Sequence, residues 1–254
     1  MVASAPALAA KRGERLYVEL ATSAREVREA QALRYRVFGE ELGARLKGGV
    51  PGLDVDEFDP VCLHLLVRES RTGEVVGCTR ILTDEGAARL GRFYSENEFD
   101  LGPIRDLPGR KLEVGRTCVA AQFRQGSAIA VLWSGLAGFI QLHGFDYLFG
   151  CASMPLGERD MQAAAIMSRL RRQALAPEPL RVSPRVPLLT AQVPDGVDAP
   201  LPALLRAYVR LGAKACGEPC RDTDFRVADV FMLLNVDELN PAYSRHFLDR
   251  VADL

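Results

Sequence analysis

The chain has 254 residues, and 48% of them are hydrophobic, which is ample for a sizeable core. Its 32 lysines and arginines nearly balance 33 aspartates and glutamates, so a net charge of −1 gives no global field that would select nucleic acid or a membrane. The six cysteines have neither the spacing of a secreted disulfide framework nor that of a zinc site. We therefore expect a cytoplasmic protein with free thiols and no metal site.

The chain start lacks the charged and apolar regions of a signal peptide. We interpret residues 1–14 as a flexible tail and residues 15–254 as a single domain. A proline-rich insertion at about 176–202, with seven prolines between Pro177 and Pro202, is expected to be irregular.

Apolar periodicity, capping residues and turn residues predict an alternating series of strands and helices. A polar connection is expected at 84–110. Strands are predicted at 16–20, 63–68, 75–83, 112–120, 147–152 and 229–235, and helices at 24–42, 128–140, 159–175 and 203–211. The helix at 128–140 is very apolar, yet it is shorter than the ~20 residues that span a bilayer.

The first helix places an arginine where an apolar residue is expected. Arg34 falls within the stripe formed by Val27, Ala30, Leu33 and Val37. A guanidinium that faces the core needs an anion, which could come from Asp56 and Asp59 or from a substrate carboxylate. Arg80 is a second charge inside a predicted strand with the same need. A structural salt-bridge network and a binding site both fit these residues.

The predicted central strand carries two charges, Glu113 and Arg116, among apolar and β-branched residues. Side chains alternate along a regular strand, so positions three apart point to opposite faces unless a bulge intervenes. Gly115 would permit such a bulge. The bulge would put both charges on one face and splay the sheet, leaving a slot for a linear ligand. A buried structural ion pair is the equally weighted alternative.

A short turn links this strand to the apolar helix and contains Gly126, Ser127 and Ala128. Small residues at a helix start let backbone N–H groups approach a phosphate, which the helix dipole favours. The turn resembles the pyrophosphate loop of the GCN5-related N-acetyltransferase (GNAT) superfamily. Phe123 stands where that loop has a basic or amide residue, which would suit a carrier-protein donor with a single phosphodiester.

Other residues extend the resemblance. Arg34 with Phe38, the run from Asp56 to Asp59, Arg80, and Glu113 with Arg116 resemble the residue set of acyl-homoserine lactone synthases. The segments 204–213, 217–219 and 229–234 are more similar to a sister family, the L-ornithine N-alpha-acyltransferases of ornithine-lipid synthesis, also called hemolysin-like.

The resemblance implies an α/β fold with a mixed, splayed central sheet flanked by helices and a C-terminal insertion. It also implies transfer of a (3-hydroxy)acyl chain from acyl carrier protein to the α-amine of L-ornithine, giving lyso-ornithine lipid. No permanently bound cofactor is expected, since the acyl-phosphopantetheine of the carrier, or acyl-CoA, is the donor. The amphiphilic product suggests brief contact with the inner membrane.

Thioester aminolysis suggests a role for each candidate. Glu113 would take the proton of the attacking amine. One of Arg116, Arg80 and Arg34 would clamp the amino-acid carboxylate, while Asp56 and Asp59 would receive the distal ammonium. Phe38 is assigned to substrate binding by the resemblance, and Gly126, Ser127 and Ala128 to the donor phosphate.

Two other functions remain open at this point. An acyl-homoserine lactone synthase, or another GNAT enzyme that uses acyl-CoA, would differ in the acceptor amine. A membrane-lytic protein is suggested by the hemolysin label alone and would need an amphipathic or spanning segment, which the sequence does not contain.

Overall fold

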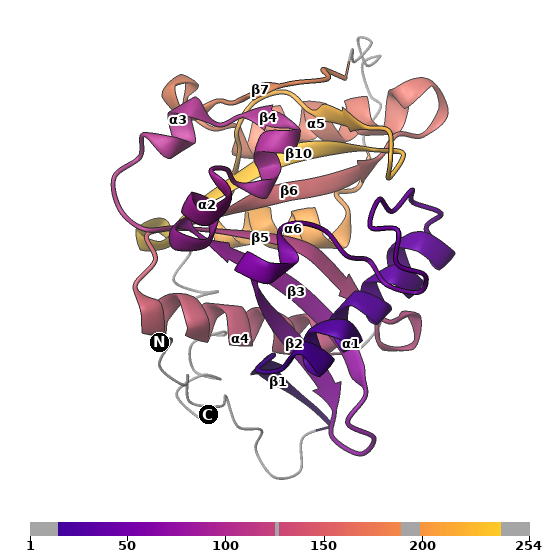
Figure 1. Cartoon of the computed structure of the whole chain (residues 1–254). Coiled ribbons are helices and arrows are strands. Elements are labelled where there is room, and N and C mark those ends of the chain that lie inside the picture. The colour runs from indigo at the N-terminus through magenta and orange to yellow at the C-terminus, as the bar shows by residue number, and fades with distance from the viewer. Residues whose placement is uncertain (1–14, 125–126, 189–198, 240–254) are drawn as a thin grey trace. The chain divides into compact units, whose positions relative to one another are not determined.

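Residues 15–124, 127–188 and 199–239 are described by a computed structural model of the chain (Figure 1). The predicted flexible tail 1–14, Gly126 and part of the proline-rich insertion lie outside the described residues. By their internal contacts the residues form two compact units, and the expectation of one domain stays a prediction. Among the described residues, the first unit includes 15–82 and 114–144, and the second includes Thr83–Glu113 and 145–239.

The first unit is built on the strands β1 (Leu16–Leu20), β2 (Leu63–Glu69) and β3 (Val75–Thr83), which pair antiparallel in that order. The predicted hairpin between β2 and β3 is confirmed, with Gly73 in the left-handed conformation at its turn. The last part of β5 (Lys111–Val119) also belongs to this unit.

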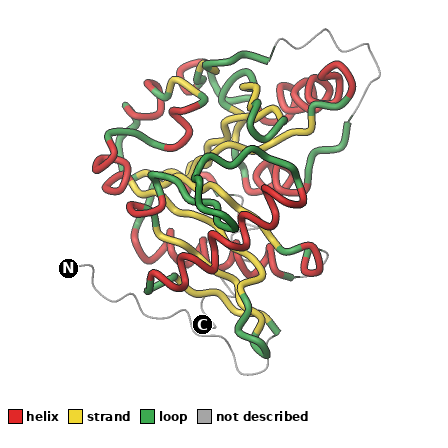
Figure 2. The backbone as a smooth tube through the Cα atoms, turned by 45° about the vertical axis from the view of Figure 1, so that its right-hand side comes forward, coloured by secondary structure: helices red, strands yellow, loops and turns green. Residues whose placement is uncertain are grey.

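Two helices cover opposite faces of these strands (Figures 1 and 2). The helix α4 (Ala128–His143) packs on β1 and β2, and a Cβ at Gly135 would lie 2.6 Å from Cγ2 of Val18. Only a glycine allows the helix backbone to approach the strand so closely. On the other face, Glu19 and Glu29 both bind Arg68, which connects β1 and β2 to the helix α1 (Ala24–Arg34).

The helix α1 begins at a capping box, in which the Ser23 side chain accepts a hydrogen bond from the Glu26 N–H. The predicted helix 24–42 is found as α1 followed by the π-helical turn η1 (Tyr35–Glu41), and Gly43 ends it with a φ of 69°. The 3₁₀ turn η2 (Asp59–Val61) precedes β2, and η4 (Ala121–Phe123) follows β5.

The second unit is centred on β6 (Tyr147–Pro155) and β10 (Val227–Asn235), which pair antiparallel along their whole lengths. The strands β8 (Lys214–Ala215) and β9 (Cys220–Asp222) both pair with β10. Four rings, those of Phe93, Phe99, Phe149 and Phe231, are in contact in its core, with centroids 5.0 to 5.9 Å apart.

The remaining elements of the second unit include some that the sequence did not reveal. The connection 84–110 contains two α-helices, a 3₁₀ turn and a strand, all too short to show a period. The proline-rich segment contributes a two-residue strand that pairs with one of them. In full, the remaining elements of the second unit are α2 (Asp84–Leu90), η3 (Tyr94–Asn97), β4 (Phe99–Asp100), α3 (Gly102–Arg105), η5 (Glu158–Asp160), α5 (Met161–Ala174), η6 (Glu178–Leu180), β7 (Ser183–Pro184), α6 (Ala203–Leu211) and η7 (Val236–Glu238).

The central strand β5 has an irregular backbone conformation next to Gly115, the residue at which a bulge was expected. Its parallel ladder with β6 joins Lys111–Glu113 to Tyr147–Phe149. The residue after Gly115, Arg116, adopts a left-handed conformation with a φ of 52°. A non-glycine residue in this conformation costs about 1–2 kcal/mol, which its ion pairs can offset. The mixed, helix-flanked sheet of the predicted α/β fold class is confirmed.

None of the helices in the described residues is both long enough and apolar enough to cross a bilayer.

Candidate functional site

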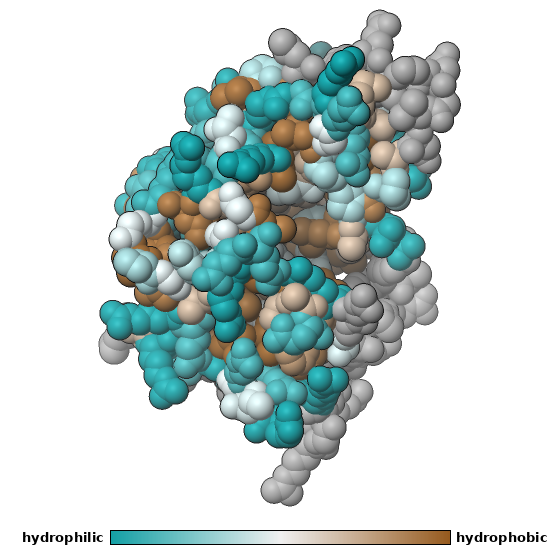
Figure 3. Space-filling view, turned by 90° about the vertical axis from the view of Figure 1, so that its right-hand side faces the viewer, coloured by the Kyte–Doolittle hydropathy of each residue, from teal (hydrophilic) through white to brown (hydrophobic). Residues whose placement is uncertain are grey.

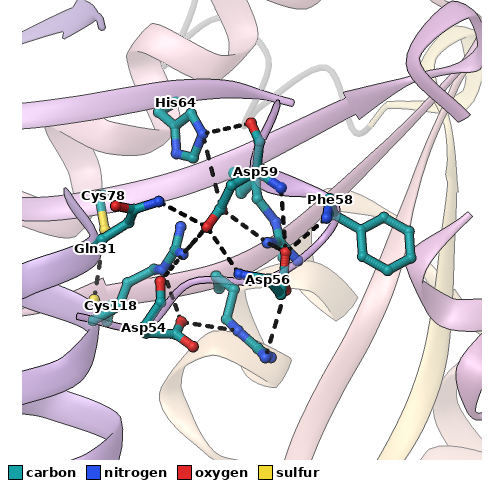
Figure 4. Close-up of polar contacts among 12 residues, drawn as sticks. Gln31, Asp54, Asp56, Phe58, Asp59, His64, Cys78 and Cys118 are labelled. Carbon is teal, nitrogen blue, oxygen red and sulfur yellow. Dashed lines mark hydrogen bonds and ion pairs between the residues drawn. The ribbon is translucent and has the colours of Figure 1, made fainter. Parts of the chain in front are cut away.

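Three arginines and three aspartates form one connected group inside the first unit (Figure 4). We call this group the Arg–Asp network; its members are Arg34, Asp54, Asp56, Asp59, Arg80 and Arg116. Opposite charges in equal number allow such a group to be buried without a net charge.

Arg34 is the last residue of α1, and its side chain is only 1% exposed. Its Nε donates to Oδ2 of Asp54 at 2.8 Å, and its Nη2 donates to the Asp54 carbonyl. The same Nη2 donates to both carboxylate oxygens of Asp59, at 3.0 and 2.9 Å. The anions that the buried guanidinium requires are therefore protein carboxylates.

Asp59 lies at the centre of the network, at the start of η2. Besides Arg34, its oxygens accept hydrogen bonds from Gln31 Nε2 at 2.9 Å, the Asp56 N–H at 3.2 Å and Arg80 Nη1 at 3.0 Å. Burial by itself raises the pKa of Asp59, but the charges of Arg34 and Arg80 outweigh it, so the net shift is downward. Asp59 is therefore held as a carboxylate.

Asp56 is at the edge of the network, with a side chain that is 21% exposed. Its Oδ1 accepts from Arg80 Nη1 at 2.6 Å and from the N–H groups of Phe58 and Asp59, at 2.9 and 3.2 Å, which shapes the acidic loop. Its Oδ2 is buried and accepts no hydrogen bond from the described residues. This oxygen is an acceptor that a ligand could use.

Arg116 approaches the same two aspartates from β5. Its Nε donates to Oδ2 of Asp54 at 3.2 Å, and its Nη2 lies 3.9 Å from Oδ2 of Asp56. The guanidinium is 6.0 Å from the ring centroid of Phe38, which is buried. With 15% of its side chain exposed, Arg116 is more accessible than Arg34 or Arg80.

His64 contacts the network without adding charge to it. Its Nε2 lies 3.3 Å from the Asp59 carbonyl and 3.9 Å from Oδ1 of Asp59. Burial lowers the pKa of His64, so the ring is neutral at neutral pH. The network consequently has as many arginine as aspartate charges.

Glu113 belongs to the second unit, where it is 2% exposed. Its carboxylate accepts the N–H of Tyr94 at 2.6 Å, the N–H of Ser95 at 2.7 Å and the hydroxyl of Ser95. The Ser95 hydroxyl also lies 3.2 Å from Sγ of Cys151. Three donors fix the orientation of the carboxylate and stabilise its negative charge.

The residues predicted to bind the donor phosphate are described in part. Ala128 is the first residue of α4 and is fully buried, and Ser127 precedes it. Gly126 lies outside the described residues. The role of this turn stays a prediction.

A second acidic group lies in the second unit, and we call it the carboxylate cluster. One carboxylate oxygen each of Glu98, Asp222 and Asp229 lies within 4.8 Å of the others, which is close enough to hold a cation. Burial, and then Asp229, raises the pKa of Glu98 to about 9. A proton on Glu98 at neutral pH therefore lowers the negative charge of the cluster without a metal ion.

The structure adds residues to the site that the sequence did not single out. Asp54 binds both Arg34 and Arg116, and its position two residues before Asp56 was the available signal. Gln31 lies one helical turn before Arg34, which places it on the same face of α1. The contact of Ser95 with Glu113 had no signal, because 18 residues separate them.

Comparison with known proteins supports this fold. Residues 33–134, which include all of the Arg–Asp network, match a family profile described as an acetyltransferase (GNAT) domain. The chain of a solved CoA-dependent acyl-homoserine lactone synthase, BjaI with SAM and isopentyl-CoA, superposes with a TM-score of 0.54 over 94% of this chain and 90% of its own, at 15% identity. The acyl-homoserine lactone synthase LasI gives 0.51 over 88% and 91%, also at 15% identity. These likenesses show the fold.

Curated relatives are much closer in sequence. The L-ornithine N(alpha)-acyltransferase of Rhodobacter capsulatus is 35% identical over 251 residues, which cover 92% of this chain and 95% of the relative. The proteins of the same name from Rhizobium meliloti and Brucella abortus are 33% and 30% identical; each alignment covers 91% of this chain, and 84% and 88% of the relatives. This chain is therefore an acyltransferase that belongs to the L-ornithine N(alpha)-acyltransferase family.

Proposed function

We propose that the protein transfers a (3-hydroxy)acyl chain from acyl carrier protein to the α-amine of L-ornithine, which gives lyso-ornithine lipid. The observation that carries the proposal is the identity of 30–35% with relatives named for this acceptor, along about nine-tenths of the chain. The product would be an amide whose fatty chain and charged amino acid make it amphiphilic.

The accessible edge of the Arg–Asp network supports a site for the amino acid. Arg34 and Asp59 are 1% and 4% exposed in their side chains, and Arg80 is 3% exposed, so we assign them to holding the loop in place. Arg116 and Asp56 are the more exposed members. In our proposal the Arg116 guanidinium binds the substrate carboxylate, and Oδ2 of Asp56 accepts a hydrogen bond from the distal ammonium. Phe38 packs against Arg116 and would limit its rotation.

The reaction is aminolysis of a thioester. The lone pair of the unprotonated amine attacks the carbonyl carbon, a C–N bond forms, and the C–S bond breaks to release the thiol. Glu113 would take the proton that the amine loses and return it to the sulfur, directly or through water. The three donors from Tyr94 and Ser95 would keep its carboxylate in one orientation during this transfer.

The donor side of the proposal depends on the turn before α4. Backbone N–H groups at Ser127 and Ala128 would bind the phosphodiester of the phosphopantetheine arm, with Gly126 beside them. Carrier protein and coenzyme A share this arm, so the two donors differ in the rest of the molecule. An acidic carrier would also require basic residues on the surface, for which Arg169, Arg171 and Arg172 are candidates.

Product identity is the direct test. The purified protein is incubated with a 3-hydroxyacyl carrier protein and a mixture of amino acids, and the products are identified by mass. We expect N-acyl-ornithine, and acyl-CoA in place of the carrier should react more slowly. Acyl-homoserine lactone from a parallel reaction with S-adenosylmethionine would overturn the proposal in favour of a lactone synthase.

The Asp56 assignment has a test of its own. Asp56→Asn should raise the KM for ornithine about 10- to 100-fold, the cost of a lost charged hydrogen bond, and should leave the KM for norvaline, which lacks the distal amine, nearly unchanged. Glu57→Gln, an exposed neighbour on the same loop, is the matched control. An equal rise in the KM for ornithine and for norvaline would contradict a contact between Asp56 and the distal ammonium.

The proposed base is tested by Glu113→Gln, which should lower kcat by about 10²- to 10⁴-fold. The fall of kcat at acidic pH that the wild type shows should be absent in the variant. Full turnover by Glu113→Gln would remove Glu113 from the mechanism.

A further inference from the structure

The segment between η1 and the Arg–Asp network combines exposed apolar and basic side chains. Residues 42–53 contain Arg45 and Lys47 and no acidic residue, in a chain whose overall charges nearly balance. They also contain four large aliphatic residues, namely Leu42, Leu46, Val50 and Leu53. We call residues 42–53 the basic–apolar loop.

Two of its aliphatic side chains are unusually exposed. Leu42 is 60% exposed and Val50 is 43% exposed, and only four large hydrophobic residues are exposed to this degree in the part of the chain that the structure describes. Arg45 and Lys47 are exposed as well. Figure 3 turns the side of the molecule where this loop lies in Figure 1 toward the viewer, and apolar residues there lie among hydrophilic ones.

This exposure belongs to a folded loop that is fixed at several points. The Leu42 N–H donates to the Val37 carbonyl at 3.1 Å, and the Asp54 N–H donates to the Gln31 carbonyl at 3.1 Å. At Gly48 the backbone lies so close to Val55 that a Cβ would be 2.1 Å from the Val55 carbonyl oxygen. The middle of the loop is therefore held close to the chain that follows it, while Leu42 and Val50 stay exposed.

We propose that the basic–apolar loop binds the surface of an anionic lipid bilayer. Aliphatic side chains can enter the boundary between headgroups and acyl chains, while arginine and lysine bind lipid phosphates. The pattern of this loop, with two cations between two exposed aliphatic side chains, matches both requirements. Contact through so few residues is weak and reversible.

The position of the loop in the chain places the proposed bilayer contact next to the proposed reaction. This link between the two rests on the proposed function. The residue directly after the loop is Asp54, which binds both Arg34 and Arg116. An amphiphilic product formed at Arg116 would be released beside the loop, where a bilayer could receive its acyl chain. An acidic carrier protein is the other partner that two cations would attract, and the experiment separates the two.

The test is cosedimentation of the full chain with vesicles at low salt, and binding of unacylated carrier protein to the same variants is measured in parallel without vesicles. Vesicles of phosphatidylcholine with 30% phosphatidylglycerol are compared with pure phosphatidylcholine. We expect binding to the anionic vesicles and at least tenfold weaker binding to the neutral ones. The double variants Leu42→Ser/Val50→Ser and Arg45→Gln/Lys47→Gln should each lose at least tenfold in the partition coefficient.

Matched controls use residues of similar exposure elsewhere in the first unit. Leu142→Ser, at a position that is 64% exposed on α4, and Arg25→Gln/Arg28→Gln on α1 should bind vesicles as the wild type does. Urea midpoints show whether each variant is folded. Unchanged binding by both loop variants, no preference for anionic lipid, or loss of carrier binding in place of vesicle binding would each overturn the proposal.

The assay contains no acyl donor or acceptor, so its outcome is separate from that of the proposed reaction. Failure to bind vesicles with normal formation of N-acyl-ornithine would overturn the bilayer contact alone. Vesicle binding without N-acyl-ornithine would overturn the proposed function and leave the contact standing.

Discussion

The Arg–Asp network of the first unit and the carboxylate cluster of the second unit each bring three carboxylates together, in different electrostatic surroundings. In the network, Arg34, Arg80 and Arg116 balance the aspartates, so that Asp59 stays charged although only 6% of it is exposed. In the cluster, burial raises the pKa of Glu98 to about 9. Balanced charges can be buried as ions, whereas an excess of one sign takes up a proton.

The difference also separates their chemical uses. The charges that we propose bind a zwitterionic amino acid must be present at neutral pH, and pairing with Arg34 and Arg80 keeps Asp59 a carboxylate. The cluster is held by the fold of the second unit, with Asp229 accepting a hydrogen bond from Ser153 at 2.7 Å. The pKa of Glu98 is raised to about 9 by burial and by Asp229, whereas the pKa of Asp59 is lowered by Arg34 and Arg80, so the two carboxyl groups change charge in different pH ranges.

The largest effect should come from breaking the balance of the network. Arg34→Met should lower the free energy of unfolding by about 3–5 kcal/mol, because it leaves Asp54 and Asp59 buried without their main partner. Urea unfolding measures the loss. Arg25→Met, at an 88% exposed arginine of the same helix, should change stability by at most about 0.5 kcal/mol. A loss below about 1 kcal/mol for Arg34→Met would show that the network is not a unit.

Removing the central carboxylate should have a somewhat smaller, pH-dependent effect. The folded-state pKa of Asp59 is lowered from 3.8, so its stabilisation is present above pH 3.8 and is lost as the pH falls through the folded pKa. Asp59→Asn should cost about 3 kcal/mol at pH 7, and the difference from the wild type should shrink below pH 3.8. Unfolding curves between pH 2 and pH 7 measure this, and a constant difference would contradict the assignment.

The carboxylate cluster should respond in the opposite direction. The folded-state pKa of Glu98 is raised from 4.5 to about 9, so the folded protein binds more protons and its stability falls as the pH rises between these values. Glu98→Gln removes this dependence and should stabilise the protein by about 1–3 kcal/mol at pH 9, but not at pH 4. Destabilisation of Glu98→Gln at pH 9 would show that a charged Glu98 is needed there.

The sequence was informative where a charge interrupts an apolar pattern. Arg34 in a helical stripe and Arg80 in a strand were both predicted to need anions, and the acidic run 54–59 supplies them. The sequence did not reveal the short elements between residues 84 and 110, because helices and strands of two to seven residues have no measurable period. It also did not reveal that Tyr94 and Ser95 hold Glu113, since that contact depends on tertiary structure.

The left-handed residue in β5 shows the same limit at one position. Glycine tolerates a positive φ at no steric cost, yet the left-handed residue of β5 is Arg116 and not its neighbour Gly115. The left-handed backbone lets Arg116 contribute to the ion pairs with Asp54. A local rule based on backbone preference was overridden by charge pairing that the local sequence does not contain.

The smallest effect tests that explanation by comparing two arginines with positive φ. Arg226, which is exposed in the turn before β10, has a φ of 56° and no ion pair among the described residues. Arg226→Gly should therefore stabilise the protein by about 0.5–1 kcal/mol, since it relieves the strained backbone and removes no partner. Arg116→Gly relieves the same strain but removes a charge from Asp54, so it should destabilise. Urea unfolding at pH 7 measures the change in the free energy of unfolding for both variants. If both variants are more stable than the wild type, charge pairing does not maintain the left-handed backbone at Arg116.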